Sequence, residues 1–358
     1  MATVILTGGG TAGHCTPNIA LIPYLKNDFD KIFYIGSENG IEKNIVRDNG
    51  IPYYGISTAK LKRSFSPANF AIPFKVIKGI KQAGKILDEL KPDVVFSKGG
   101  YVAVPVVIAA KKRKIPVVAH ESDYTAGLAN KISARYCKKV LTSFPDTAKT
   151  VKRGEYVGSP IRESLYGVSQ KDALKFFGLT GEKPVLLVFG GSLGARAIND
   201  ALYKALPELL PRYDVIHVCG KGNLPQETDT QNGYAQSKTG YRVYEYLNEM
   251  EKAFACASLC VTRAGANSLF EIMSLKLPCV LIPLPKGTSR GDQVLNAEYF
   301  QKLGLAYVLD QKALTAESLA YAINSVYANR YNVKRSFDKH PVTGASRAIS
   351  RIIADYKR

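Results

Sequence analysis

Residues 4–13 read VILTGGGTAG and residues 186–195 read LLVFGGSLGA, and these two stretches decide the fold. Each begins with a short apolar run, continues into paired glycines and a further small residue, and then enters a segment with helical character. The two stretches start about half a chain apart in a sequence of 358 residues. The repeat therefore predicts two similar α/β domains, each opening with a strand, a glycine loop and a helix.

Short β-rich runs alternate with longer amphipathic segments along most of the chain, which is typical of doubly wound parallel sheets. A proline interrupts regular structure in GSPIR at 158–162, which marks the join between the domains. Residues 344–356 space apolar side chains along one face of a helix, which we expect to pack back on the first domain. The predicted strands are 4–7, 31–35, 93–97, 117–120, 139–142, 185–189, 215–219, 259–262 and 280–283.

Length and composition indicate a globular protein of about two domains. The chain is 46% apolar and 22% charged, and no apolar run approaches the roughly 18 residues of a membrane-spanning helix. The first residues lack the basic segment of a signal peptide, so we expect none. The six cysteines include no C-x-x-C pair and mostly lie in apolar surroundings, which predicts buried thiols in a cytoplasmic protein.

The formal net charge of +19 is unevenly distributed. Residues 1–161 carry 24 Lys and Arg against 12 Asp and Glu, whereas residues 162–358 carry 25 against 18. So large a positive charge indicates an anionic partner. Nucleic acid, an acidic membrane and a phosphate-bearing substrate all fit this description.

Gly8, Gly10 and Gly13 have the G-x-G-x-x-G spacing of dinucleotide-binding proteins. A nicotinamide site also requires an acidic residue at the end of the second strand. Here Glu38 lies just beyond that strand, in a poor position, and the glycines are followed at once by His14. An oxidoreductase is therefore disfavoured, and a histidine beside the loop suits either chemistry or a hydroxyl contact.

The glycine loops expose backbone N–H groups at helix starts, where they attract phosphate. A third such loop, SKGGYVAVP at 97–105, follows a strand of the first domain. Single glycines often do no more than permit a tight turn. Three such loops together favour phosphate binding.

The stretch TRAGANSLFEIMSLKLPCVLIPLP at 262–285 predicts a strand, a turn of small residues and a helix with Glu271 in its second turn. A carboxylate there can accept hydrogen bonds from both hydroxyls of a ribose. The alternative is that Glu271 is simply a favourable acid near a helix N-terminus.

Taken together, the motifs resemble those of the MurG family of bacterial N-acetylglucosaminyltransferases over nearly the whole chain. The motifs that occur in the order of that family are GGGTAGH, SKGGYVAVP, HESDYTAGLANK, GSPIR, GGSLGAR, TRAGANSLFEI and RGDQVLNA. The resemblance implies the GT-B architecture, in which two Rossmann-like, doubly wound parallel-sheet domains face one cleft. Residues 1–161 with 341–358 would form the acceptor-binding, membrane-facing domain, and residues 162–340 the domain that binds UDP-N-acetylglucosamine (UDP-GlcNAc).

The implied activity is inverting transfer of N-acetylglucosamine (GlcNAc) to the C4 hydroxyl of undecaprenyl-diphosphate-linked N-acetylmuramyl-pentapeptide. This step belongs to peptidoglycan synthesis, and through it to cell-wall biogenesis, cell shape and cell division. The protein would act at the cytoplasmic face of the cell membrane, without nucleic acid and without a cofactor or metal, since helix N-termini and arginine can neutralise UDP.

The resemblance also assigns site residues. Glu271 would hold the ribose, Leu247 would present its backbone to the uracil, and Gln293 would hold sugar hydroxyls. The remaining residues expected to bind the donor or substrate are Thr11, Ala12, Gly13, Arg162, Ser192, Ala266, Asn267, Ser268, Leu269 and Phe270. The acceptor diphosphate would face Gly10, Gly99, Gly100 and Tyr101.

Two positions depart from some family members, which have asparagine at the position of Asp123 and glutamine at that of Asp292. Both departures add a carboxylate. His14 is the first candidate for the general base because an imidazole titrates near neutrality, and Asp123 is the second.

A lipid acceptor requires contact with a membrane, and residues 60–85 offer a basic and apolar surface for it. This segment holds seven basic residues and no acid, interleaved with apolar side chains. The alternative is an ordinary helix with its apolar stripe in the core. The residues predicted to form the membrane patch are Phe65, Phe70, Phe74, Lys75, Lys78 and Lys81.

Other functions also fit parts of the pattern. A related GT-B enzyme, such as a UDP-GlcNAc 2-epimerase or a glycolipid synthase, shares the predicted fold. A basic nucleic-acid-binding protein would explain the charge, but no recognition motif supports it. A non-catalytic sugar-nucleotide subunit is disfavoured by His14 and by the complete first domain.

Overall fold

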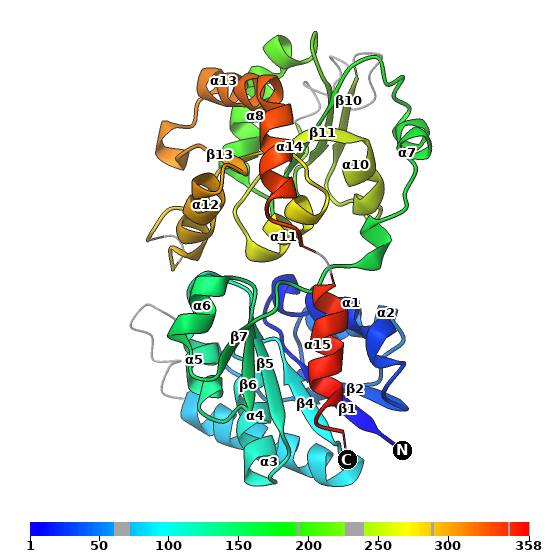
Figure 1. Ribbon diagram of the computed structural model, residues 1–358, viewed down its shortest axis with the longest axis vertical. Helices are drawn as coiled ribbons and strands as arrows, with labels where there is room; N and C mark the ends of the chain where they lie inside the picture. The colour runs from blue at the N-terminus through cyan, green and yellow to red at the C-terminus, as the bar shows by residue number, and fades with distance from the viewer. Residues whose placement is uncertain (61–71, 192–193, 226–239, 288–289, 343, 358) are drawn as a thin grey trace. The chain divides into compact units, whose positions relative to one another are not determined.

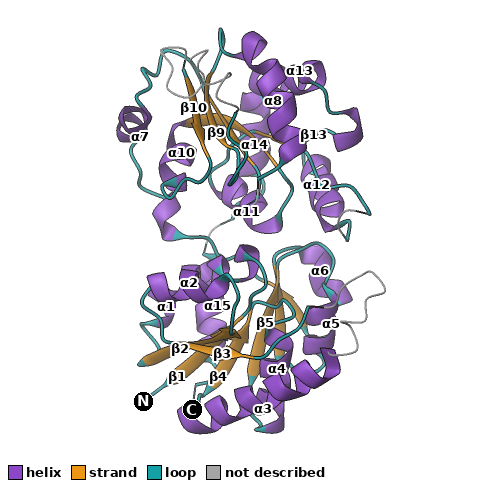
Figure 2. Ribbon diagram, turned by 180° about the vertical axis from the view of Figure 1, so that it is seen from behind, coloured by secondary structure: helices purple, strands orange, loops and turns teal. Residues whose placement is uncertain are grey.

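The computed structural model describes residues 1–60, 72–191, 194–225, 240–287, 290–342 and 344–357. The chain divides into two compact units (Figures 1 and 2). Unit 1 comprises Met1–Arg162 and Gly344–Arg358, and unit 2 comprises Glu163–Thr343.

The sheet of unit 1 has seven parallel strands in the order β3-β2-β1-β4-β5-β6-β7. All side chains of the central strands β1, β4 and β5 are buried, because helices cover both faces of a parallel sheet. The strands are β1 (Thr3–Thr7), β2 (Lys31–Ser37), β3 (Tyr53–Ile56), β4 (Val94–Ser97), β5 (Val117–Glu121), β6 (Lys139–Thr142) and β7 (Gly154–Tyr156).

Two groups of helices sandwich this sheet. Along β1, Val4 and Leu6 pack with the first group, which includes α1 and α15, whereas Ile5 packs with the second group, which includes α3 and α4. The helices of unit 1 are the 3-10 turn η1 (Ala12–His14), α1 (Thr16–Leu25), α2 (Glu42–Asp48), α3 (Ile72–Leu90), α4 (Ala103–Lys112), α5 (Leu128–Ala134), α6 (Pro145–Thr150) and α15 (Ala345–Ala354).

The C-terminal helix α15 returns to unit 1, as the sequence predicted. Ile349 and Ile353 are fully buried in the same core cluster as Leu21 and Leu25 of α1. Figure 1 shows α15 in red within the unit that begins the chain. Burial of this apolar stripe explains why its spacing was visible in the sequence.

Unit 2 is built on a six-stranded parallel sheet in the order β10-β9-β8-β11-β12-β13. Its main core lies between this sheet and the helices α8 and α13. The strands are β8 (Val185–Phe189), β9 (Asp214–Val218), β10 (Tyr241–Tyr244), β11 (Ala257–Thr262), β12 (Cys279–Leu281) and β13 (Ala306–Val308). The helices are η3 (Glu163–Leu165), α7 (Gln170–Phe177), α8 (Arg196–Leu209), α10 (Met250–Cys256), α11 (Ala266–Ser274), α12 (Asp292–Lys302), η4 (Gln311–Ala313), α13 (Ala316–Ala328) and α14 (Arg330–Asp338).

The prediction of two Rossmann-like, doubly wound parallel-sheet domains is confirmed, and each of the nine predicted strands is present. The four strands that the sequence did not reveal, β3, β7, β10 and β13, are the edge strands of the two sheets. Each is three or four residues long and partly exposed, so it gives a shorter and weaker signal in the sequence than a central strand. All six cysteines are free thiols and buried, as expected.

Candidate functional site

The central strands of unit 1 bring three loops together at one edge of the sheet. Thr7, the last residue of β1, pairs with Ser97 of β4, and Ser97 pairs with Ala119 of β5. The loops that leave the carboxyl ends of these strands are therefore neighbours. In an open parallel sheet this edge is where ligands bind.

The first two loops pack on each other through glycines. Gly10 and Gly100 both have left-handed backbone, with φ of 88° and 78°. A Cβ on Gly10 would collide with the ring of Tyr101, and one on Gly100 would collide with the carbonyl oxygen of Gly9. The two positions therefore require glycine for their backbone conformation and for their close contacts.

His14 lies at the same place, in η1. A Cβ on Gly100 would be 3.4 Å from Cγ of His14, so the imidazole lies against the second glycine loop. His14 Nδ1 is 2.9 Å from the Thr11 hydroxyl oxygen. The structure thus brings together the predicted residues Gly10, His14, Gly100 and Tyr101.

The backbone N–H of Gly10 donates a hydrogen bond to a carboxylate of the protein itself. Gly10 N donates to Glu42 Oε2 at 3.2 Å, and the backbone and hydroxyl of Ser37 donate to Glu42 Oε1 at 3.0 and 2.5 Å. Glu42 is fully buried. This carboxylate fixes the first glycine loop, and the sequence analysis did not single it out.

The third loop, after β5, is organised by Glu121. Its Oε1 accepts from Asp123 N at 3.0 Å, and its Oε2 accepts from Gly127 N at 2.9 Å and from Asn130 Nδ2 at 2.8 Å. Glu121 therefore holds the backbone at Asp123, the second candidate base. Asn130 also packs on Gly99, where a Cβ would collide with its amide.

Beneath these loops, Lys98 and His120 form a buried pair that the sequence did not reveal. Lys98 Nζ lies 2.9 Å from His120 Nδ1 and also donates to the Ser122 hydroxyl. Burial lowers the pKa of the Lys98 ammonium to about 8, although Glu121 and Asp123 act in the opposite direction. Burial and the neighbouring Lys98 hold the pKa of His120 well below its ordinary value.

In unit 2 the carboxyl ends of β8 and β11 are likewise adjacent, since Phe189 pairs with Thr262. The loop after β8 approaches the end of β9, because a Cβ on Gly194 would collide with the Cys219 carbonyl. Ser192, one of the residues predicted to bind the donor or substrate, lies outside the described residues.

The turn after β11 has the form that the sequence predicted. It leads into α11, whose first residue is Ala266 and whose sixth is Glu271, half-buried in the second turn. Asn296 Nδ2 donates to the Ala264 carbonyl at 3.1 Å, and Arg263 Nη1 donates to the Ile282 carbonyl at 3.0 Å. These two buried side chains fix the turn that presents the start of α11, with the predicted residues Asn267, Ser268, Leu269 and Phe270.

The segment that leads into α12 contains two further predicted positions. Gln293 Oε1 accepts from the backbone of Leu284 at 3.0 Å, so this side chain anchors the loop after β12. Asp292 lies 2.7 Å from Arg290 Nε. Arg290 thus pairs with the carboxylate of Asp292, one of the two positions where the sequence departs from some family members.

The fold also places the other residues that were predicted to bind the donor or substrate. Leu247 is buried in the connection between β10 and α10. Arg162 is half-buried at the end of the first segment of unit 1. Thr11 is exposed beside Ala12 and Gly13 at the start of η1. Their roles in binding remain predictions.

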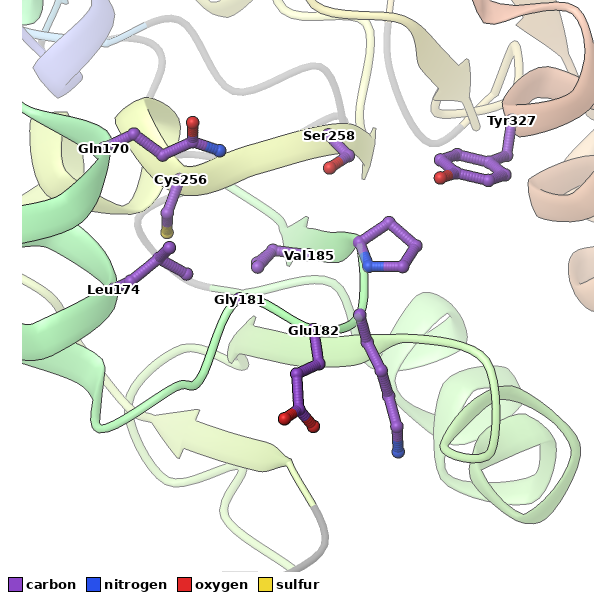
Figure 3. A pocket seen from close by; sticks show the side chains of 10 residues that line it. Gln170, Leu174, Gly181, Glu182, Val185, Cys256, Ser258 and Tyr327 are labelled. Atoms are coloured by element: carbon purple, nitrogen blue, oxygen red, sulfur yellow. The ribbon is translucent and has the colours of Figure 1, made fainter.

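Unit 2 also has a cavity of about 260 Å³ that is separate from the candidate donor residues (Figure 3). It is lined by Val185, the first residue of β8, and by Ser258, near the start of β11, together with Gln170 and Tyr327. It therefore opens at the amino ends of the strands, opposite the edge that carries the candidate donor residues. We assign it no part in the site.

Helix α3 carries the described part of the predicted membrane patch. Phe74 and Ile77 are 76% and 53% exposed, and Lys75, Lys78 and Lys81 are exposed around them, whereas Leu87 is buried. The alternative of an apolar stripe wholly in the core therefore fails at Phe74. The predicted positions Phe65 and Phe70 lie outside the described residues. No helix in the described part of the chain is long and apolar enough to cross a membrane.

Comparison with known proteins places both units in one family. Residues 4–142 match the glycosyltransferase family 28 N-terminal domain, and residues 185–352 match the corresponding C-terminal domain.

The relatives match over the whole sequence. Across 361 aligned residues, covering 100% of both chains, this protein is 45% identical to the UDP-N-acetylglucosamine–N-acetylmuramyl-(pentapeptide) pyrophosphoryl-undecaprenol N-acetylglucosamine transferase of Clostridium botulinum (strain Langeland). It is 49% identical to the protein of the same name from Clostridium perfringens over 330 residues, 91% of this chain and 90% of that one. The crystal structure of Acinetobacter baumannii MurG matches with a TM-score of 0.77 and 27% identity, over 99% of this chain and 100% of that one.

Proposed function

The chain belongs to glycosyltransferase family 28, and on that basis we propose that it transfers GlcNAc from UDP-GlcNAc to the C4 hydroxyl of undecaprenyl-diphosphate-linked N-acetylmuramyl-pentapeptide. The observation that carries the proposal is the match, over the full length of both chains, to relatives whose name states this transfer. The product serves peptidoglycan synthesis, and hence cell-wall biogenesis, cell shape and division.

Unit 2 binds the donor in this proposal. The amides at the start of α11, beginning at Ala266, face the diphosphate of UDP, and the carboxylate of Glu271 accepts the ribose hydroxyls. The fixed turn before α11 supports this assignment, because Asn296 and Arg263 hold its backbone in place before any ligand arrives. The amide oxygen of Gln293 anchors the loop after β12, and its Nε2 group holds the sugar.

Unit 1 binds the acceptor and supplies the base. In the tautomer that carries its proton on Nδ1, His14 donates to Thr11 and has its lone pair on Nε2. That nitrogen takes the proton of the C4 hydroxyl as the oxygen attacks the anomeric carbon and UDP departs with inversion. Gly99, Gly100 and Tyr101 face the acceptor diphosphate. The reaction uses backbone amides and arginine for the leaving group and needs no metal or other cofactor.

The lipid acceptor explains the surface of α3. Phe74 and Ile77 enter the membrane interface, and the neighbouring lysines interact with anionic headgroups at the cytoplasmic face. The protein is therefore peripheral, and no nucleic acid takes part.

A UDP-GlcNAc 2-epimerase is the alternative with the same fold, and one assay separates the two functions. UDP release from UDP-GlcNAc is measured with and without a lipid-linked muramyl-pentapeptide. The transferase releases UDP in proportion to turnover only when the acceptor is present. Acceptor-independent conversion of UDP-GlcNAc to its 2-epimer would contradict the proposal.

A further inference from the structure

Lys98 is a buried cation at the centre of the candidate site of unit 1. It follows the last residue of β4, and its backbone N–H donates to Thr7 O of β1 at 2.8 Å. Its side chain is only 1% exposed. Lysine is almost never so buried without a specific arrangement around it, since removing an ammonium group from water is costly.

Both atoms that Lys98 Nζ contacts belong to neutral groups. His120 Nε2 lies 2.9 Å from the carbonyl oxygen of Gly158, which can only accept, so this nitrogen carries the proton. Nδ1 then has the lone pair and accepts from Lys98 Nζ at 2.9 Å. The second acceptor is the Ser122 hydroxyl. Within the described part of the chain, these contacts fix the ammonium group without a directly bonded carboxylate that would cancel its charge.

The charge lies beneath the two glycine loops. Lys98 is bonded to Gly99, which begins the left-handed pair Gly99–Gly100. On the other side, a Cβ on Gly8 would be 3.1 Å from Lys98 Cβ. Ser122 links the same ammonium group to the loop after β5, whose next residue is Asp123.

Two buried polar atoms beside Lys98 have no partner among the described residues. They are the hydroxyl oxygen of Ser97 and the amide oxygen of Asn130. Buried polar groups are normally satisfied, so each such atom requires an explanation. Both atoms belong to residues next to this site, because Ser97 precedes Lys98 in the chain and Asn130 packs on Gly99.

We propose that Lys98 is a positioning residue for the acceptor: its ammonium group, held by His120 and Ser122, sets a fixed positive charge beneath Gly99 and Gly100, where the acceptor diphosphate binds. This inference rests on the proposed function and adds the residue that makes the site in unit 1 favourable for a diphosphate. Lys98 acts through the loops, because its side chain is covered. A buried charge is screened less by salt and water than a surface lysine.

The test compares Lys98→Gln with Lys98→Met and with the exposed control Lys112→Gln. Glutamine keeps a hydrogen-bond donor without the charge, and methionine removes both. The KM for the lipid-linked acceptor should rise about tenfold or more in both Lys98 variants, as expected for a lost charged interaction. The KM for UDP-GlcNAc and the affinity for UDP should not change, because the residues proposed to hold UDP, Glu271 and the start of α11, lie in unit 2.

A Lys98→Gln enzyme with the acceptor KM of the wild type would overturn the proposal, since a purely structural role needs only the hydrogen bonds. The Lys112→Gln control should match the wild type in every parameter.

The wild-type protein provides a second measurement that does not depend on folding of the variants. The titratable groups around Lys98 are His120 and Glu121 from β5, Asp123 from the following loop, and His14 from η1. Burial holds the pKa of His120 well below its ordinary value and raises the pKa of Tyr101 above its own. Above pH of about 8 the Lys98 ammonium loses its proton, so the acceptor KM should rise while the donor KM stays constant. An acceptor KM that is flat from neutrality to about pH 9.5 would contradict the proposal.

The control for the proposed function is wild-type turnover with the acceptor. If the wild type releases no UDP with that acceptor, the proposed function fails and this inference fails with it. If the wild type turns over normally but the Lys98→Gln enzyme keeps its acceptor KM, only the role of Lys98 fails.

Discussion

Nδ1 of His14 lies 2.9 Å from the hydroxyl oxygen of Thr11, three residues earlier in the same 3-10 turn. This contact orients the imidazole at the edge where the loops after β1 and β4 meet. A histidine fixed through Nδ1 presents its other nitrogen for proton transfer. The contact with Thr11 therefore sets the orientation of the imidazole that we propose as the general base.

His14→Ala should lower kcat by about 100-fold or more, because a positioned general base contributes on that order. UDP affinity should be unchanged, since His14 belongs to unit 1 whereas Glu271 and the start of α11, which are proposed to hold UDP, belong to unit 2. Steady-state kinetics and calorimetry with UDP measure the two quantities, and His340→Ala is the matched control. A near-normal kcat in His14→Ala would remove His14 from the reaction and make Asp123 the leading candidate.

Glu271→Ala should weaken UDP binding by about tenfold or more, because a carboxylate that accepts ribose hydroxyls contributes about 1.5–3 kcal/mol. Glu271 is half-buried in α11, so the fold should survive the substitution. The exposed Glu298 of α12 provides the control variant Glu298→Ala. Unaltered UDP affinity in Glu271→Ala would show that the ribose binds elsewhere.

The α3 surface should bind anionic vesicles through two separable contributions. Replacing Lys75, Lys78 and Lys81 with glutamine should weaken binding and make the remainder less sensitive to salt, since each basic residue contributes up to about 1 kcal/mol at an anionic surface. Phe74→Ser should weaken binding at every salt concentration, because it removes apolar area that is buried in the interface. Vesicle co-sedimentation measures both effects.

Thermal melting is the companion measurement for these surface variants. Phe74 is exposed, so Phe74→Ser should melt near the wild-type temperature. Turnover with a short, water-soluble acceptor should also be unaffected. Unfolding of Phe74→Ser, or full vesicle binding by both sets of variants, would remove α3 from membrane contact.

His217 should make unit 2 sensitive to acid. Its imidazole ring is hydrogen-bonded on both sides, with Nε2 at 3.0 Å from Asn199 Oδ1 and Nδ1 at 2.9 Å from the Tyr241 hydroxyl oxygen. Burial lowers the pKa of His217 to about 3. Between pH of about 6.5 and about 3 the unfolded chain therefore binds a proton that the folded unit does not, and the free energy of unfolding falls as the pH falls. The depressed pKa of His120 acts in the same direction in unit 1.

The measurement is the difference in melting temperature between the wild type and His217→Gln at pH 7 and at pH 5. The substitution should lower the melting temperature less at pH 5 than at pH 7. At pH 5 the wild type has already lost part of the stability that depends on neutral His217. An equal difference at the two pH values would contradict the assignment.

The sequence predicted most of the fold because its signals were local. The nine central strands are short runs of mostly apolar residues, and the repeated strand, glycine loop and helix marked both units. The edge strands were not predicted because they are short and partly exposed. In Gly154–Tyr156, for example, the local sequence does not separate the strand from a loop.

The candidate site was predicted only in part. Glycine loops and the position of Glu271 in its helix are properties of spacing, and the structure has them as expected. Lys98, His120 and Glu121 were within the quoted motifs, but their contacts depend on the order of β1, β4 and β5 in the sheet. Glu42 accepts a hydrogen bond from the backbone of Gly10, which lies 32 residues earlier in the chain, and the sequence alone gives no indication of this contact.

The most direct test of the central claim is identification of the product by NMR after reaction of UDP-GlcNAc with a short-chain lipid-linked N-acetylmuramyl-pentapeptide. The account predicts one GlcNAc joined to the C4 hydroxyl of the muramyl sugar, with the anomeric configuration opposite to that in UDP-GlcNAc. A retained configuration, attachment at another hydroxyl, or a modified UDP-sugar with unaltered acceptor would contradict it.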